Sequence, residues 1–346
     1  MNVALQGRYR LLVHDGDTVR YTSPWFDNLI TDAGMDRVAQ GFWFTTCFVG
    51  SGIAEPLYAD TQLAHYEAET DITESAFGSS SSNFGSSSSS GNVFSDVLNV
   101  PPYYGFIRVH YYFPVGALDK VNVSEVGVGW LTDSSSDSSS SSGYRLFSHA
   151  LVTNSLDEPQ PVKVYEFEQL EVQYELRLYP RLEDYIYTQE LAGITSTCVA
   201  RAAQVTDPLY WAINRTPVDL TAALYVYDGV GAPASSSDEE PAAVALGSIF
   251  GLPYGASAEG IVAETLSYQP GSHFLDFMVE WGSTSANFAG GVQAVSFQTY
   301  GLGSFQVGID PPIAKTSAGF LRLQLRVLWY RLDESSSGWA ESSSSL

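Results

Sequence analysis

Acidic side chains are the residues most able to do chemistry in this chain, which has 39 Asp and Glu against 16 Lys and Arg. Asp276 and Glu280 are candidates for the acid/base pair of a glycosidase, a reaction that needs two carboxylates around the scissile bond. Asp15 and Asp17 flank a glycine and could bind calcium, because this hard cation prefers clustered carboxylates. A plainer interpretation exists for each pair, since Asp-Gly is typical of tight turns and acidic pairs arise by chance in so acidic a chain. We therefore expect solvated carboxylates at both places.

The histidines and cysteines form no recognisable metal-binding motif. The five histidines are His14, His65, His110, His149 and His273. They lack His-x-x-x-His spacing, and Cys47 and Cys198 lack Cys-x-x-Cys spacing. His110 falls in an aromatic stretch, where a hydrogen-bonded packing residue is a better interpretation than a ligand. The apolar or small neighbours of both cysteines predict buried free thiols.

Nucleotide-binding motifs are missing as well. The segments Gly301-Leu-Gly303 and Gly229-Val-Gly231 lack the third glycine and the βαβ context of a dinucleotide fold. The sequence has no Gly-Lys-Ser/Thr phosphate loop and no nucleophile elbow. It therefore predicts no catalytic residues, no cofactor-binding residues, no cofactor, no metal site and no enzyme activity.

Composition and charge exclude several classes of partner. The formal net charge is -23, and Lys occurs only at positions 120, 163 and 315. A nucleic-acid-binding protein needs a cationic stripe, so we expect no nucleic-acid partner. No stretch approaches the ~18 apolar residues of a membrane span, and the start of the chain lacks a signal-peptide pattern. We therefore expect synthesis in the cytoplasm and no membrane insertion. An acidic, lysine-poor surface suits a halophilic setting, although acidic proteins of ordinary environments are common too.

Two stretches predict long β-strands with one solvent-exposed face. Apolar and polar residues alternate through 170–179, where Glu171, Gln173, Glu175 and Arg177 occupy the polar positions. The same alternation runs through 321–329. A period of two places alternate side chains on opposite faces of a strand. The stretch 104–113 would carry aromatic side chains on both faces of a strand, which indicates a strand buried between layers or against a partner.

The remaining elements are shorter. Residues 8–22 predict a β-hairpin in which Asp15-Gly16 supplies a type I′ turn. Near-helical spacing of Ile30, Ala33 and Val38, with Gly41 as a C-cap, predicts one short helix near residues 28–40. Residues 42–49 have the composition of a buried strand.

Serine runs interrupt the chain, and we interpret them as flexible loops and a tail. They occupy residues 79–82, 86–90, 134–142, 235–237, 335–337 and 342–345, with Asp137 breaking the third. We expect an all-β protein of two β-sandwich-like units: an N-terminal domain at 1–195, a C-terminal domain at 196–334 and a Ser-rich flexible tail at 335–346.

A series of motifs resembles a family of tailed-bacteriophage structural proteins, often described as tail or tail-fibre proteins. The motifs follow one another in order along most of the chain. They are Trp25 to Asp36, Cys47 to Gly52, Pro56 to Leu63, Val123 to Trp130, Leu146 to Val152, Glu168 to Pro180, Gly290 to Ala294, Phe305-Gln306 and Pro311 to Thr316. The stretch 217–285 matches poorly, and residue 149 is His where the pattern leads us to expect Arg.

The resemblance implies a virion protein that acts by assembly. We expect a structural subunit of a tail, baseplate or tail fibre that forms a symmetric homo-oligomer, with a trimer as the first candidate, and docks to other virion proteins. Exposed sheet edges and abundant Tyr, Trp and Phe suit such contacts. One alternative is a head decoration, turret or collar subunit. Another is an adhesin that binds a host surface glycan or receptor.

Overall fold

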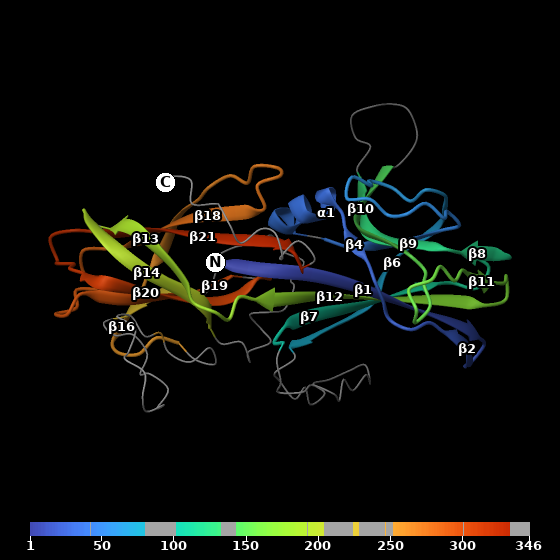
Figure 1. The fold of residues 1–346 in the computed structure, drawn as a ribbon, viewed down its shortest axis with the longest axis horizontal. Coiled ribbons are helices and arrows are strands. Elements are labelled where there is room, and N and C mark those ends of the chain that lie inside the picture. The colour runs from blue at the N-terminus through green and yellow to red at the C-terminus, as the bar shows by residue number, and fades with distance from the viewer. Residues whose placement is uncertain are drawn as a thin grey trace.

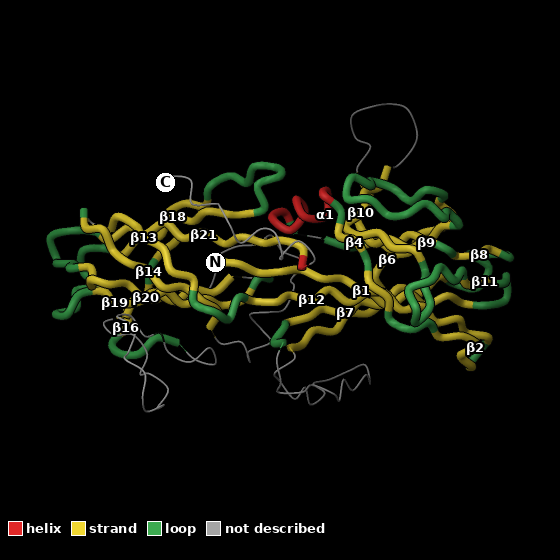
Figure 2. Tube along the Cα trace, in the orientation of Figure 1, coloured by secondary structure: helices red, strands yellow, loops and turns green. Residues whose placement is uncertain are grey.

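The computed structural model describes residues 1–41, 43–79, 102–132, 143–191, 193–203, 224–227, 246, 252–299 and 301–332. Strands dominate this part of the chain and one short α-helix interrupts them, as Figure 2 shows, so the all-β prediction is confirmed. Apart from Ser79, the serine runs and the predicted tail lie outside the described residues.

A 13-stranded sheet runs along the long axis of the molecule (Figure 1). Its order is β17 (Ile261–Thr265), β18 (Phe274–Trp281), β21 (Leu321–Arg331), β1 (Asn2–Asp15), β12 (Gln169–Pro180), β7 (Gly105–Phe113), β6 (Tyr66–Ser79), β5 (Thr46–Gly50), β9 (Glu125–Thr132), β10 (Gly143–Leu151) and β4 (Leu29–Ile30). Two further strands, β2 (Thr18–Thr22) and β3 (Phe26–Asp27), pair with β1 off this path.

This sheet curls into a sandwich in one half of the molecule. The first part of β6 pairs with β5 and its second part pairs with β7, so β6 turns the corner between two layers. At the opposite corner, β3 pairs with β1 and the adjoining β4 pairs with β10. The curled sheet thereby buries the inward side chains of β1, β12 and β7 against those of β5, β9 and β10.

The other half contains a second sheet of six strands. Its order is β13 (Tyr185–Leu191), β14 (Ile194–Ala203), β20 (Gly303–Ile313), β19 (Val292–Thr299), β15 (Leu224–Tyr227) and β16 (Ser257–Glu259). It shares one hydrophobic core with β18 and β21, in which Trp281, Phe297 and Phe305 are fully buried. A small pair, β8 (Val121–Val123) with β11 (Val162–Val164), lies at the far end of the sandwich half (Figure 1).

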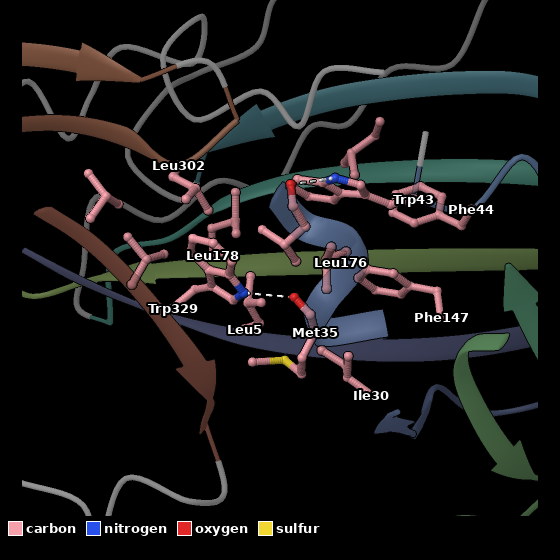
Figure 3. Close-up of a cluster of buried hydrophobic side chains, with 14 of the residues drawn as sticks. Leu5, Ile30, Met35, Trp43, Phe44, Phe147, Leu176, Leu178, Leu302 and Trp329 are labelled. Carbon is pink, nitrogen blue, oxygen red and sulfur yellow. Dashed lines mark hydrogen bonds between the residues drawn. The ribbon is translucent and has the colours of Figure 1, made fainter. Parts of the chain in front are cut away.

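The one α-helix of the described residues lies where the two halves meet. Helix α1 spans Asp32–Arg37 and continues as a 3-10 turn over Val38–Gln40, so the predicted helix exists but begins later than residue 28. It begins there because Leu29–Ile30 pairs with β10 and the Thr31 hydroxyl caps the helix by accepting from Gly34 N at 2.9 Å. Figure 3 shows the indole of Trp329 donating to the backbone oxygen of Met35, at 2.8 Å.

Strand β1 belongs to both halves. It pairs antiparallel with β12 from Val3 to His14 and parallel with β21 from Asn2 to Leu5. The β13–β14 hairpin runs across residue 195. The division into domains at that residue stays a prediction.

The two long alternating strands are confirmed, but the predicted solvent-exposed face of the strand at 170–179 is wrong. Strand β21 alternates buried with exposed or half-buried residues, as expected. On β12, however, Glu171 and Glu175 are buried on the polar side. Arginine and histidine side chains from the neighbouring strands β1 and β7 cover both carboxylates, so the polar period of two marked a polar network rather than a solvent-exposed face.

The predicted hairpin at 8–22 is confirmed and its turn type is corrected. Asp15 pairs with Thr18 across the turn. Gly16 has φ +56°, whereas Asp17 is not among the residues of positive φ. A type I′ turn needs positive φ at both central residues, so the type I′ prediction is wrong.

Candidate docking loop and its buried clamp

Asp276 and Glu280 lie on the same face of β18, each opposite an arginine of β21. Asp276 accepts two bonds of 2.7 Å from Arg326, and Glu280 accepts one of 2.6 Å from Arg322. Four residues along a strand span roughly 13 Å, which exceeds the roughly 5–9.5 Å between glycosidase carboxylates. The structure therefore does not bring this pair into a catalytic arrangement.

The other candidate residues lie apart from one another. Asp15 and Asp17 are exposed at the hairpin tip, and no group of three or more His, Cys, Asp or Glu among the described residues is arranged to hold a metal ion. Cys47 and Cys198 are free and buried, as predicted, and burial raises the pKa of both thiols. Gly301-Leu-Gly303 forms the β19–β20 turn, whereas Gly229-Val-Gly231 lies outside the described residues.

The loop between β5 and β6, residues 51–65, presents apolar side chains to solvent. Ile53 is 82% exposed, Leu57 is 61% exposed and Tyr58 is 38% exposed. The loop lies beside β10 and β4, in light blue in Figure 1. Exposed apolar side chains on a loop that a rigid scaffold holds in place are typical of a binding surface.

Backbone contacts fix this loop along its length. Tyr58 O accepts from Asp32 N of helix α1 at 2.8 Å, and Thr61 O accepts from Leu146 N of β10 at 3.1 Å. Near the end of the loop, Leu63 packs in a small cluster with Phe48 and Leu146 on the outer face of the sandwich. The loop therefore has a defined conformation rather than a free one.

Glu125, the first residue of β9, clamps both ends of the loop. Its side chain is fully buried and accepts from the backbone N–H groups of Gly52 at 2.9 Å, Ala64 at 2.9 Å and His65 at 2.6 Å. A fourth bond, of 3.1 Å, comes from Nε2 of His149. Burial raises the pKa of Glu125, but these hydrogen bonds outweigh burial and lower it to about 2. The carboxylate therefore stays ionised.

His149 of β10 joins this clamp to a second carboxylate. Its Nδ1 lies 2.8 Å from Oδ2 of Asp60, which also accepts from Leu57 N at 2.8 Å within the loop. The ring is 2% exposed and lies between the two carboxylates, with one nitrogen within hydrogen-bond distance of each.

Residues that are far apart in the sequence meet at this clamp. Glu125 of β9 accepts from Gly52 N, and His149 of β10 contacts Asp60 of the loop. The Glu125 carboxylate leaves no room for a side chain at Gly50, because an added Cβ would lie 2.6 Å from Oε1 of Glu125. Sequence reasoning did not identify Glu125 or Asp60, because nothing local distinguishes them from other acids of an acidic chain.

A second cluster of charged side chains lies on the outward face of β1, β12 and β7. Glu175 is 1% exposed and accepts from Arg8 Nε at 2.9 Å, Arg108 Nε at 2.8 Å and Arg177 Nε at 2.8 Å. The guanidinium groups of Arg8 and Arg108 lie 4.4 and 5.1 Å from the ring centre of Trp25. Burial raises the pKa of Glu175, and the charges of the arginines outweigh burial and lower it.

Another carboxylate, Glu171, lies on the same face between two histidines. It pairs with His110 Nδ1 at 2.9 Å and His14 Nε2 at 2.8 Å, and it accepts from Gln173 Nε2 at 2.7 Å. His110 is therefore a hydrogen-bonded packing residue, as predicted. Burial raises the pKa of Glu171, but the hydrogen bonds outweigh burial and lower it to about 2.

Comparisons of the chain with protein-family models, with curated proteins and with solved structures found no match. Within the described part of the chain, no helix is long and apolar enough to span a membrane. The arrangement that remains for a functional interpretation is an ordered apolar loop held by a buried ionic clamp.

Proposed function

We propose that this protein is a structural subunit of a tailed-virus particle, in the tail, baseplate or tail fibre, and that it acts by docking and self-assembly rather than by catalysis. The observation that carries the proposal is the ordered loop 51–65 with its exposed Ile53, Leu57 and Tyr58. The viral setting is supported by the motif series, four segments of which supply the residues of the clamp.

The physical argument concerns the entropy of binding. A flexible loop loses conformational freedom when it binds, and this loss weakens association. The contacts to Glu125, His149 and β10 order the loop before any partner arrives. Its exposed apolar side chains then gain free energy by leaving water, at roughly 25 cal/mol per Å² buried.

The experiment asks whether the chain is present in purified virus particles and where it lies in them. Particles are purified from infected cells and probed by mass spectrometry and by electron microscopy with an antibody against this chain. The proposal expects the chain in the particle and label on the tail. Label confined to the capsid supports the head-subunit alternative, and absence of the chain from the particle contradicts the proposal.

A variant pair tests the role of the loop. Ile53→Ser combined with Leu57→Ser should lower incorporation of the chain into particles about tenfold, since each loses a buried apolar side chain at the interface. Ile261→Ser is the matched control, because Ile261 is 74% exposed on the distant strand β17. Equal incorporation of all three proteins, with unchanged stability, would show that the loop is not a docking surface.

A further inference from the structure

Among the described residues, strand β13 forms an edge of the six-stranded sheet with no strand paired on its outer side. All seven of its residues, Tyr185–Leu191, pair with β14 without a bulge. It contains no Pro and no Lys, and Ile186 is 66% exposed. Pro, bulges and charged side chains, Lys above all, are devices that keep edge strands from pairing with other chains, and β13 has one such charge, Glu190.

The other described edges carry such protection. At the opposite edge of this sheet, β16 has only three residues. In the large sheet, β17 is interrupted by a bulge between Val262 and Glu264, and β4 has two residues followed closely by helix α1. Among the strands that the structure describes, β13 is therefore the long, regular edge with room for a partner strand.

The turn geometry shows which backbone groups of β13 point outward. Leu191 pairs with Ile194 across a two-residue connection, so this pair exchanges both of its hydrogen bonds. Bonded pairs alternate along an antiparallel ladder. The N–H and C=O groups of Ile186, Thr188 and Glu190 consequently face away from β14, and the described residues give them no partner. Unsatisfied backbone groups in a row are complementary to another extended strand.

An identical strand fits this edge in one register. If two copies of β13 run antiparallel about a two-fold axis at Thr188, Thr188 faces Thr188 and Ile186 faces Glu190. Every outward N–H and C=O of these three residues then has a partner. On the other face, Tyr185, which is 40% exposed, lies opposite the apolar Leu191. A two-fold axis at Glu190 would place the two Glu190 carboxylates opposite each other. A two-fold axis at Ile186 would leave the outward backbone groups of Glu190 without a partner on the second β13.

We infer that β13 pairs with β13 of a second copy and joins two six-stranded sheets into one continuous sheet. This contact is separate from the docking loop and goes beyond the proposed function. It predicts a dimer of the isolated chain rather than the trimer considered from the sequence. Because each copy carries a net charge of -23, the contact should strengthen when salt screens the repulsion between copies.

The test compares the full-length wild type with Thr188→Pro and Thr188→Val by sedimentation velocity at several concentrations in low and high salt. Wild type and Thr188→Val should reach twice the monomer mass. Thr188→Pro removes an outward N–H at a position where an edge strand tolerates Pro, and it should weaken dimerisation about tenfold or more. Circular dichroism confirms that each variant is folded.

A second variant covers the case in which Thr188→Pro does not fold. Ile186→Lys places an exposed charge on the same edge and should also give monomers, while Ile261→Lys on β17 should remain dimeric. A wild type that stays monomeric at high salt overturns the inference, as does a folded Thr188→Pro or Ile186→Lys that dimerises like the wild type. These outcomes are independent of incorporation into particles, which tests the proposed function.

Discussion

Nε2 of His149 lies 3.1 Å from Oε2 of Glu125, at a point where the histidine is 2% exposed and the glutamate fully buried. The two residues belong to neighbouring strands, yet their bond organises a loop that belongs to neither strand. Glu125 holds the backbone at both ends of loop 51–65, and His149 reaches Asp60 in its middle. A buried ionic contact thus determines the shape of an exposed surface.

Replacing Glu125 by Gln should lower the free energy of unfolding by about 3–5 kcal/mol. The change leaves the His149 ring without its buried carboxylate partner and puts an amide N–H₂ against backbone donors. Chemical denaturation measures the loss, and limited proteolysis should cut the 51–65 loop faster. Glu55→Gln, an exposed change in the same loop, is the control and should be neutral. Equal stability of the two variants would contradict the clamp.

The effect of replacing His149 should depend on whether the new side chain can donate to both carboxylates. His149→Ala leaves Glu125 and Asp60 without the group between them and should lower the free energy of unfolding by about 1–3 kcal/mol. His149→Arg supplies several donors and should retain more stability than His149→Ala. Thermal unfolding of both variants provides the comparison. The reverse ranking would show that ring packing matters here and hydrogen bonding does not.

Acid should destabilise the fold through Glu125 and Glu171. Both carboxyl groups have a pKa of about 2 in the folded protein, against an ordinary value of 4.5. A lowered pKa contributes stability that is present above the ordinary value and is lost as pH falls from 4.5 towards 2. Each group contributes roughly 3 kcal/mol at most. Denaturation at pH 7, 5, 4 and 3 should show this loss, and Glu125→Gln should show a shallower one; a flat profile below pH 5 would refute it.

Glu175→Gln should destabilise the outward face of β1, β12 and β7. The carboxylate is 1% exposed and compensates Arg8, Arg108 and Arg177, which would otherwise repel one another. We expect a loss of about 3–5 kcal/mol in the free energy of unfolding, measured by chemical denaturation. Glu280→Gln is the control, because Glu280 and Arg322 form a more exposed pair that should contribute at most about 1 kcal/mol. Similar losses in both variants would argue against a special role for Glu175.

Strand periodicity predicted much of the fold. The alternation in 170–179 and 321–329 identified β12 and β21, because a two-residue period is a local property of the chain. Helix α1 was also predictable, although its start was not. The pairing of Leu29–Ile30 with β10 involves residues more than a hundred positions away, and this contact shortens the helix.

The charge clusters could not be predicted, since burial of a charge depends on the surrounding strands. Glu171 and Glu175 occupy positions that normally face solvent, and only the register of β1 and β7 supplies the histidines and arginines that cover them. Glu125 is a comparable case. Its partners come from loop 51–65 and from β10, so no local pattern around Glu125 indicates its role.

The double role of β1 affects how the chain folds. Asn2 pairs with Leu328, and Val13 of the same strand pairs with Leu170. A ribosome completes β1 long before β12 and β21, so this strand must wait for partners that are synthesised later. Sequence-distant pairing of this kind slows folding and leaves edges open to misassembly in the meantime. Efficient production of the protein should therefore benefit from chaperones or slow growth at low temperature.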